Sequence, residues 1–323
     1  MSMNTQVTAS PSISLRKKMI PLWNQLGMLI ILVLLCLVLA LFAPYFTEAS
    51  NMLNILKQSS ITAILAAGMT LVILTGGIDL SVGATLALAG VISVMLSNSG
   101  VHPVTAMAAG AVVGYVAGAI NGYLTAVAKL PSFVVTLGSM TYLRGIAFVI
   151  SSGLPVVLQN KLFIFFGAGT LLGIPTPIYI MAVVYIAMFF VLKYTMFGRH
   201  VYAIGGNEEA ARLTGIKVER TLIHVYSLSG LMAGIAGVVM AGRVISGQPN
   251  AGISFELDAI AAVILGGTSF VGGIGRIQGT IIGVLIMAVL GNGLTLLNVD
   301  YYWQLIVKGL VIVIAVLLDK LRN

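Results

Sequence analysis

The sequence changes from apolar to glycine-rich and then acidic within one short stretch, which reads VILTGGIDLSVG at residues 72–83. Asp79 is the acidic residue of this stretch, and the segment that follows it, residues 80–128, contains no Asp, Glu, Lys or Arg. Glycines beside a carboxylate at the junction of two long apolar segments predict an interrupted helix, which is typical of transporters. A carboxylate at membrane depth marks a functional site or a buried pair. Capping of the next helix near Ser81 explains Asp79 equally well.

The composition places the whole chain in a membrane. Of its 323 residues, 59% are hydrophobic and only 8% are charged, and the mean hydropathy is +1.08. Ordinary soluble domains carry about 25% charged residues, so a soluble globular enzyme is excluded. A single cysteine, Cys36, rules out an internal disulfide framework and a cysteine-based metal cage. The net charge of +8 therefore bears on orientation in the membrane rather than on nucleic-acid binding.

Charges, prolines and glycine-rich turns divide the chain into about ten membrane spans, each of which needs roughly 20 apolar residues. The predicted fold is thus an all-α polytopic helical bundle. The spans are expected near Leu26–Phe42, Ile61–Leu74, two segments within Leu80–Ala128 divided at Ser97–Pro103, Ser132–Ile150, Ile178–Leu192, Thr221–Met240, Ile260–Val271, Ile277–Leu297 and Tyr302–Leu318. A cleaved signal peptide is the alternative for the first segment, but its apolar run is long for one and lacks an A-x-A cleavage pattern.

Lysine and arginine set the orientation because cytoplasmic loops hold the excess of these residues. With the N-terminus inside, twelve of the seventeen fall on the cytoplasmic side, and an even number of spans returns the C-terminus there. Residues 1–25 then form a cytoplasmic tail, and 26–320 form the membrane domain. The domain has a cytoplasmic loop at 197–220 and periplasmic loops at 151–177 and 243–256. Arg144 and Lys308 lie within or near spans, where pairing with an acid and snorkelling to an interface both remain open.

Two repeated patterns suggest a compact transporter bundle. Glycines recur every four residues from Gly110 to Gly122, which leaves one smooth helix face for close packing. In the second half, VILGGT at 263–268, which includes Gly266 and Gly267, echoes VILTGG at 72–77. Repetition of a glycine-interrupted span in both halves points to a transporter.

The largest hydrophilic segment, residues 197–216, predicts a short capped helix. Asn207 is suited to the N-terminal cap and Gly215 to the C-terminal cap, with two glutamates at the positive N-terminal end. The spacing of Ala210, Leu213 and Ile216 predicts one shared face, on which a soluble partner could dock. A solvated loop helix is the alternative.

Several kinds of chemistry have no sequence signature. The chain lacks the G-x-x-x-x-G-K-[ST] loop that binds ATP phosphates, and it lacks H-E-x-x-H or paired Cys/His spacing. Its three histidines are scattered. No catalytic residue, metal site or cofactor is therefore expected in this chain, and a membrane-embedded enzyme is disfavoured. Few intramembrane charges remain to couple an ion gradient, which favours energy from a partner ATPase.

Four motifs resemble those of the ribose-type monosaccharide permeases of bacterial ABC importers. The resemblance extends from about Asn51 to Asp319, although the Ile-x-Leu-Pro part of the loop that contacts the ATPase is missing. The motifs are GMTLVI at 68–73 leading to GIDLSVG at 77–83, GGN at 205–207 leading to Gly215-Ile216, Glu209-Ala210-Ala211-x-x-x-Gly215, and ELDAIAAVILGGTS at 256–269.

The resemblance implies a multi-pass permease of the bacterial inner membrane that imports ribose or a closely related monosaccharide by alternating access. It also implies a second permease copy surrounded by membrane lipids, a cytoplasmic ABC ATPase that binds ATP and Mg, and a periplasmic sugar-binding protein. The alternatives are permeases for xylose, galactose, allose or a cyclic signalling sugar, and a gradient-driven carrier. ATPase coupling would fall to Asn207, Glu208, Glu209, Ala210, Ala211, Leu213, Gly215 and Ile216. The translocation path would include Thr75, Gly76, Gly77, Asp79, Ser81, Asn121, Thr136, Gln248, Gly266 and Gly267.

Overall fold

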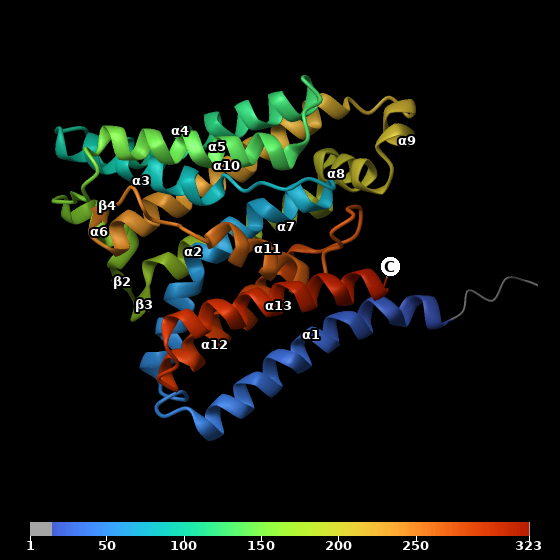
Figure 1. The fold of residues 1–323 in the computed structure, drawn as a ribbon, viewed down its shortest axis with the longest axis horizontal. Coiled ribbons are helices and arrows are strands. Elements are labelled where there is room, and N and C mark those ends of the chain that lie inside the picture. Colours follow the sequence, from blue (N-terminus) through green and yellow to red (C-terminus); the bar gives the residue numbers. More distant parts are fainter. Residues whose placement is uncertain (1–14, 323) are drawn as a thin grey trace, which may run out of the picture.

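The computed structural model describes residues 15–322 as a bundle of long helices with a few short strands (Figure 1). The helices are α1 (Leu15–Phe42), α2 (Ala49–Leu74), α3 (Val82–Asn98), α4 (Pro103–Ala126), α5 (Ser132–Ile150), α6 (Lys161–Ala168), α7 (Thr176–Tyr194), α8 (Met196–Gly206), α9 (Glu208–Leu213), α10 (Val218–Arg243), α11 (Phe255–Leu265), α12 (Ile277–Leu296) and α13 (Tyr301–Arg322). The strands are β1 (Val156–Val157), β2 (Thr170–Leu171), β3 (Ile174–Pro175) and β4 (Ser246–Gly247); β1 pairs antiparallel with β4 and β2 with β3.

Each of the ten predicted spans falls on a helix, but the helices differ in length. Six helices of the described chain, α2, α4, α5, α7, α10 and α12, are long and apolar enough to cross a membrane. Gly27–Phe42 of α1, all of α3 and Tyr301–Leu317 of α13 are shorter apolar helical segments. The total of ten spans stays a prediction. Because α1 begins at Leu15, part of the predicted tail 1–25 is helical, and residues 1–14 lie outside the described residues.

The predicted eighth span, Ile260–Val271, is short and ends in glycines, as the sequence indicates, but its predicted end is wrong because the helix stops at Leu265. The observed helix α11 has 11 residues, which at 1.5 Å per residue extend about 16 Å, roughly half of the hydrocarbon core. It ends at Leu265 because the glycine pair that follows turns the backbone, with Gly267 at a φ of +80°. The chain therefore forms a half-length helix followed by a turn.

The two ends of the bundle carry different elements. Figure 1 shows the start of α1, the end of α13 and the α8–α9 segment at one end of the molecule. At the other end lie α6, the β2–β3 hairpin and β4. The start of α1, the end of α13 and the α8–α9 segment therefore lie at one end of the bundle, and their side of the membrane stays a prediction.

The core lies along α2 and α10. Nearly every residue of α2 after Gln58 is buried, and α10 packs against α2, α3 and α4. The predicted glycine stripe of α4 meets α10 at backbone distance. A Cβ added to Gly118 would lie 2.1 Å from the Tyr226 carbonyl oxygen, and one added to Gly114 would lie 2.2 Å from that of Gly230. The stripe is thus a close helix–helix contact, as expected from the sequence.

Gly118→Ala should lower the free energy of unfolding by about 1–3 kcal/mol, because the added methyl group has no space against α10. Gly138→Ala is the matched control, since a Cβ at Gly138 of α5 meets nothing within 4 Å. Alanine there should leave stability unchanged or raise it by up to about 1 kcal/mol through its helix propensity. Thermal unfolding of both purified variants in detergent measures the difference. Equal midpoints would show that α4 and α10 are not held this closely.

Candidate functional site

The hydrophilic segment 197–216 contains two helices, α8 and α9, and the predicted capped helix is α9. The Thr195 hydroxyl accepts a hydrogen bond from the Gly198 N–H at 3.1 Å and caps α8. The Asn207 side chain accepts one from the Ala210 N–H at 2.9 Å and caps α9, as predicted. Gly215 has a φ of +86° and follows the end of α9, which also agrees with the sequence. Asn207 therefore both ends α8 and starts α9.

The faces of α9 differ from the prediction at one residue. Leu213 is 84% exposed, and Ala210 and Glu209 are also exposed. Ile216 does not share their face: it packs inward with Ala211, beside Ile204 and other members of a small apolar cluster. Helical spacing fails here because α9 ends at Leu213, before the left-handed turn. The outward surface of α9 is therefore a leucine beside a glutamate.

Arg212 fixes α9 against the start of α10. Its guanidinium bonds to the carboxylate of Glu219 and forms an ion pair with Glu208 at 3.2 Å. The hydrogen bond to Glu219, and then that to Glu208, raises the pKa of Arg212. Glu209 forms no ion pair with any residue in the 15–322 range, so its charge faces solvent.

Three backbone segments meet at the C-terminal end of α8. The Gly273 N–H donates to the Leu74 carbonyl at 2.9 Å. A Cβ added to Gly205 would lie 1.8 Å from the same carbonyl oxygen and 2.5 Å from the Gly273 nitrogen. The two glycine-rich repeats that follow α2 and α11 thus contact each other and the end of α8. We call this contact of residues 74–76, 205–206 and 271–273 the glycine junction.

Asp79 is fully buried in a polar network that joins four helices. Its Oδ1 accepts from the Ser81 N–H at 3.0 Å and the Ser81 hydroxyl at 2.6 Å, and its Oδ2 accepts from the Ser229 hydroxyl of α10 at 2.9 Å. The Asn121 amide of α4 donates to the Ser81 hydroxyl at 2.9 Å and accepts from Ser139 of α5. The carboxylate binds Ser81, the residue that precedes α3, but accepts no hydrogen bond from the first turn of that helix; it also links this segment to α10.

The predicted path residues fall into separate places. Thr136 lies close to the Asp79 network, because its hydroxyl is 3.2 Å from the Ile78 carbonyl that it donates to. Asp79, Ser81, Asn121 and Thr136 are each at most 2% exposed. Thr75, Gly76 and Gly77 keep some exposed surface at the end of α2. Gly266 is buried against α12 and Gly267 is half-buried, whereas Gln248 is half-buried beside Ser246 in another segment.

The predicted periplasmic loop 243–256 does not stay at the surface. A Cβ on Gly247 would lie 2.8 Å from Val91 Cα in the middle of α3, and a Cβ on Gly83 at its start would lie 2.3 Å from the Gly252 carbonyl oxygen. The segment therefore runs along α3 into the bundle in a non-helical conformation. Such backbone occurs at membrane depth only where it is buried in protein or lines a water-filled cavity.

Arg144 is the intramembrane cation whose partner the sequence left open. Its guanidinium donates to the carbonyls of Pro249 at 2.9 Å and Ala251 at 2.5 Å. These carbonyls have left regular helix and need donors. Arg144 thus holds the inward-running segment against α5 rather than snorkelling. A single arginine in an apolar span was the available signal, but the carbonyls that it binds have no sequence signature.

Lys308 pairs with an acid, which is one of the two alternatives that the sequence left open. Its Nζ lies 2.9 Å from Asp258 Oδ2, which joins α13 to α11. Both side chains are largely shielded, with 29% and 17% exposure. Within residues 15–322, no group of three or more His, Cys, Asp or Glu side chains is placed to hold a metal ion.

The predicted outer loops meet through their backbones. Val156 pairs with Gly247 and Val157 with Ser246, and the Leu158 N–H donates to the Ile245 carbonyl at 3.0 Å. The Asn98 amide at the end of α3 donates to the Val157 carbonyl at 2.7 Å. The β2–β3 hairpin projects beside them with Leu172 91% exposed. One outer surface is therefore built from both loops.

Comparisons with known proteins agree with this architecture. The ribose import permease protein of Escherichia coli (strain K12) is 48% identical over 306 residues, covering 94% of this chain and 95% of that protein. The ribose import permease protein of Bacillus subtilis (strain 168) is 49% identical over 302 residues, covering 93% and 94%. The D-allose transport system permease protein of Escherichia coli (strain K12) is 41% identical, covering 93% and 92%. No solved structure matches the chain.

A family model gives the classification. Residues 51–316 match the model described as branched-chain amino acid transport system / permease component. This range contains all six helices that are long enough to cross a membrane except the first two residues of α2. The chain is thus a multi-pass membrane protein, and it belongs to the branched-chain amino acid transport system permease component family.

Proposed function

We propose that this chain is the transmembrane permease subunit of an ATP-driven ABC importer for ribose, which receives the sugar from a periplasmic binding protein and releases it into the cytoplasm. The observation that carries the proposal is the 48–49% identity, over nearly the full chain, to ribose import permeases of two bacteria. Permeases named for allose and L-arabinose are less similar, at 41% and 37%.

The proposed assembly contains two permease copies in the inner membrane, with a cytoplasmic ABC ATPase that binds ATP and Mg. The exposed surface of α9, with Leu213 and the unpaired Glu209, supports contact with the ATPase. The opposite end, where the two outer loops join at β1 and β4, supports contact with the sugar-binding protein. The remaining residues of the coupling set, Asn207, Glu208, Ala210, Ala211, Gly215 and Ile216, would shape and support α9.

Coupling would pass from α9 to the membrane helices through backbone contacts. Arg212 ties α9 to α10, and Asn207 joins α9 directly to α8. The end of α8 meets the ends of α2 and of the turn after α11 at the glycine junction. A displacement of α9 on nucleotide binding would therefore reach α2, α10 and α11 together, which is what a switch between inward-open and outward-open states requires.

The proposed path has a lining and a frame. Thr75, Gly76, Gly77, Gln248 and Gly267 keep exposed surface and would line it, where sugar hydroxyls need matched donors and acceptors. The buried residues would frame it from behind, holding α3, α4, α5 and α10 in register. These are Asp79, Ser81, Asn121, Thr136 and Gly266.

Ribose uptake into proteoliposomes tests the proposal. Uptake should require the permease, a ribose-type ATPase, the binding protein and ATP, and omission of any one should reduce it to background. The measurement is accumulated labelled ribose, with labelled allose, xylose, galactose and arabinose in parallel. Ribose uptake by the permease alone would indicate a gradient-driven carrier. Transport of another sugar but not ribose would reassign the substrate.

Glu209→Lys should reduce ATP-dependent uptake at least tenfold without changing stability, because its carboxylate is exposed and pairs with no described side chain. Glu48→Lys provides the same charge change at the opposite end of the molecule, between α1 and α2, and should leave uptake unchanged. Uptake and ATPase binding are measured on permeases of equal thermal stability. Normal uptake by Glu209→Lys would remove α9 from the coupling route.

Asp79→Ala should destabilise the permease by at least about 1–3 kcal/mol, because it leaves the buried donors of Ser81 and Ser229 without an acceptor. Asp79→Asn keeps an acceptor oxygen and should cost less. Thermal unfolding ranks the stabilities of the two variants. Uptake per folded Asp79→Asn permease should stay within about twofold of the wild-type value. A tenfold loss of uptake at unchanged stability would instead place Asp79 in contact with the sugar.

A further inference from the structure

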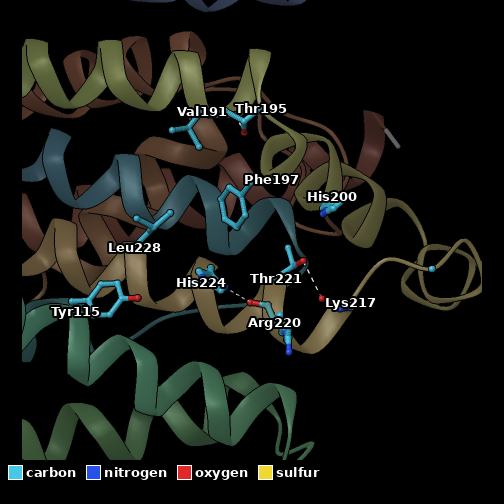
Figure 2. Close-up of a pocket in the computed structure, with 11 residues that line it drawn as sticks. Tyr115, Val191, Thr195, Phe197, His200, Lys217, Arg220, Thr221, His224 and Leu228 are labelled. Atoms are coloured by element: carbon cyan, nitrogen blue, oxygen red, sulfur yellow. Dashed lines mark hydrogen bonds between the residues drawn. The ribbon is translucent and has the colours of Figure 1, made fainter.

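A groove of about 760 Å³ opens at the α9 end of the bundle, between α4, α7, α8 and α10. Figure 2 shows Tyr115 and Leu228 at one end of this groove and His200 and Lys217 toward the other, with Phe197 between them. We call it the α8–α10 groove. It lies next to the coupling segment but contains none of the proposed path residues, and Gly215 is the one member of the coupling set that lines it.

The polar end of the groove is basic. Lys217, Arg220, His200 and His224 line it, and no aspartate or glutamate does. The neighbouring carboxylate of Glu219 is engaged by Arg212. Lys217 and Arg220 make no ion pair with any side chain that the structure describes. The start of α10 adds the partial positive charge of a helix N-terminus.

The other end of the groove is apolar and lies deeper in the membrane domain. Leu228 is eight residues beyond Arg220 in α10, which corresponds to about 12 Å along the helix. Val191 from α7 and Phe197 from α8 line the groove along with it. The Phe197 ring meets the His224 ring edge-on, with centroids 6.5 Å apart, where the apolar and basic parts join. The groove thus changes from cationic to apolar along α10.

We propose that the α8–α10 groove binds an anionic phospholipid of the inner leaflet, with its phosphate at Lys217 and Arg220 and the start of an acyl chain against Leu228 and Val191. Basic pockets between transmembrane helices on the cytoplasmic side have the charge and depth that anionic headgroups require. A soluble phosphate compound would use the basic end but leave the apolar wall exposed to water.

The bound lipid would contact α8 and the start of α10, the two helices that flank α9. Lipid charge would then stabilise one position of the coupling segment, so that ATP-driven transport depends on anionic lipid. The inference uses the proposed orientation to assign the leaflet. Its test measures lipid binding without sugar or nucleotide, so failure of ribose transport and failure of lipid binding are separate results.

The test titrates the purified full-length permease with phosphatidylglycerol or phosphatidylcholine and counts bound lipids by native mass spectrometry. The wild type should bind phosphatidylglycerol roughly thirtyfold more tightly than phosphatidylcholine. The double variant K217Q/R220Q should lose this preference, with roughly thirtyfold weaker phosphatidylglycerol binding and unchanged phosphatidylcholine binding. R199Q is the matched control, because Arg199 is an exposed cation of α8 outside the groove, and it should bind as the wild type does.

A second variant, Leu228→Trp, tests the contact with the acyl chain separately from the contact with the headgroup. Filling the apolar end should weaken both phospholipids at least fivefold, while circular dichroism confirms the helical fold. Equal phosphatidylglycerol binding by wild type and K217Q/R220Q would overturn the proposal. Displacement of the lipid by millimolar glycerol 3-phosphate would assign the site to a soluble phosphate compound. Stoichiometric release of the bound lipid when the ATPase binds would assign the groove to the ATPase subunit. Either result would also overturn the proposal.

Discussion

A peptide group that leaves a helix within a membrane must find its hydrogen-bond partner inside the protein, because lipid offers none. This constraint governs every irregular segment of the bundle. The chain leaves helix after Leu74, and that carbonyl accepts from Gly273 of the second glycine-rich turn. It runs unwound from β4 to α11, and Arg144 donates to the carbonyls exposed there. The interruptions persist because each has a partner in another segment of the chain, and the contact of Leu74 with Gly273 ties the two halves together.

Backbone contacts also connect the α8–α9 segment to the core helices, which is the route proposed for coupling. Side chains could absorb a displacement by changing rotamer, but five of the eight residues of the glycine junction are glycines. Backbone meets backbone between α8 and the turns that follow α2 and α11. The close contact of α4 with α10 has the same character. The Asp79 network adds buried polar contacts among α3, α4, α5 and α10. Such close packing suits alternating access, in which helices move as bodies.

The sequence predicted the helices well, because apolar runs bounded by charge, proline and glycine depend on local residues alone. The interval Ser132–Ile150 was predicted to the residue, and the caps at Asn207 and Gly215 were correct. Errors arose where tertiary contacts decide. Apolar content could not show that α11 stops after 11 residues or that residues 246–254 run inward. The partners of Arg144 and Lys308 are a pair of carbonyls and an aspartate that lie 50 to 107 positions away in sequence. Spacing carries no information at that range.

The pairing of β1 with β4 uses main-chain hydrogen bonds, which are indifferent to the identity of most side chains. The backbone geometry of this surface therefore does not depend on which side chains it exposes. Substitutions at exposed positions such as Leu172 or Ile174 would change what the surface recognises while the two loops stay joined. In the proposed importer, the surface that receives the binding protein could therefore change while the backbone beneath it stays the same. New binding proteins, and with them new sugars, could be acquired without rebuilding the helices that move.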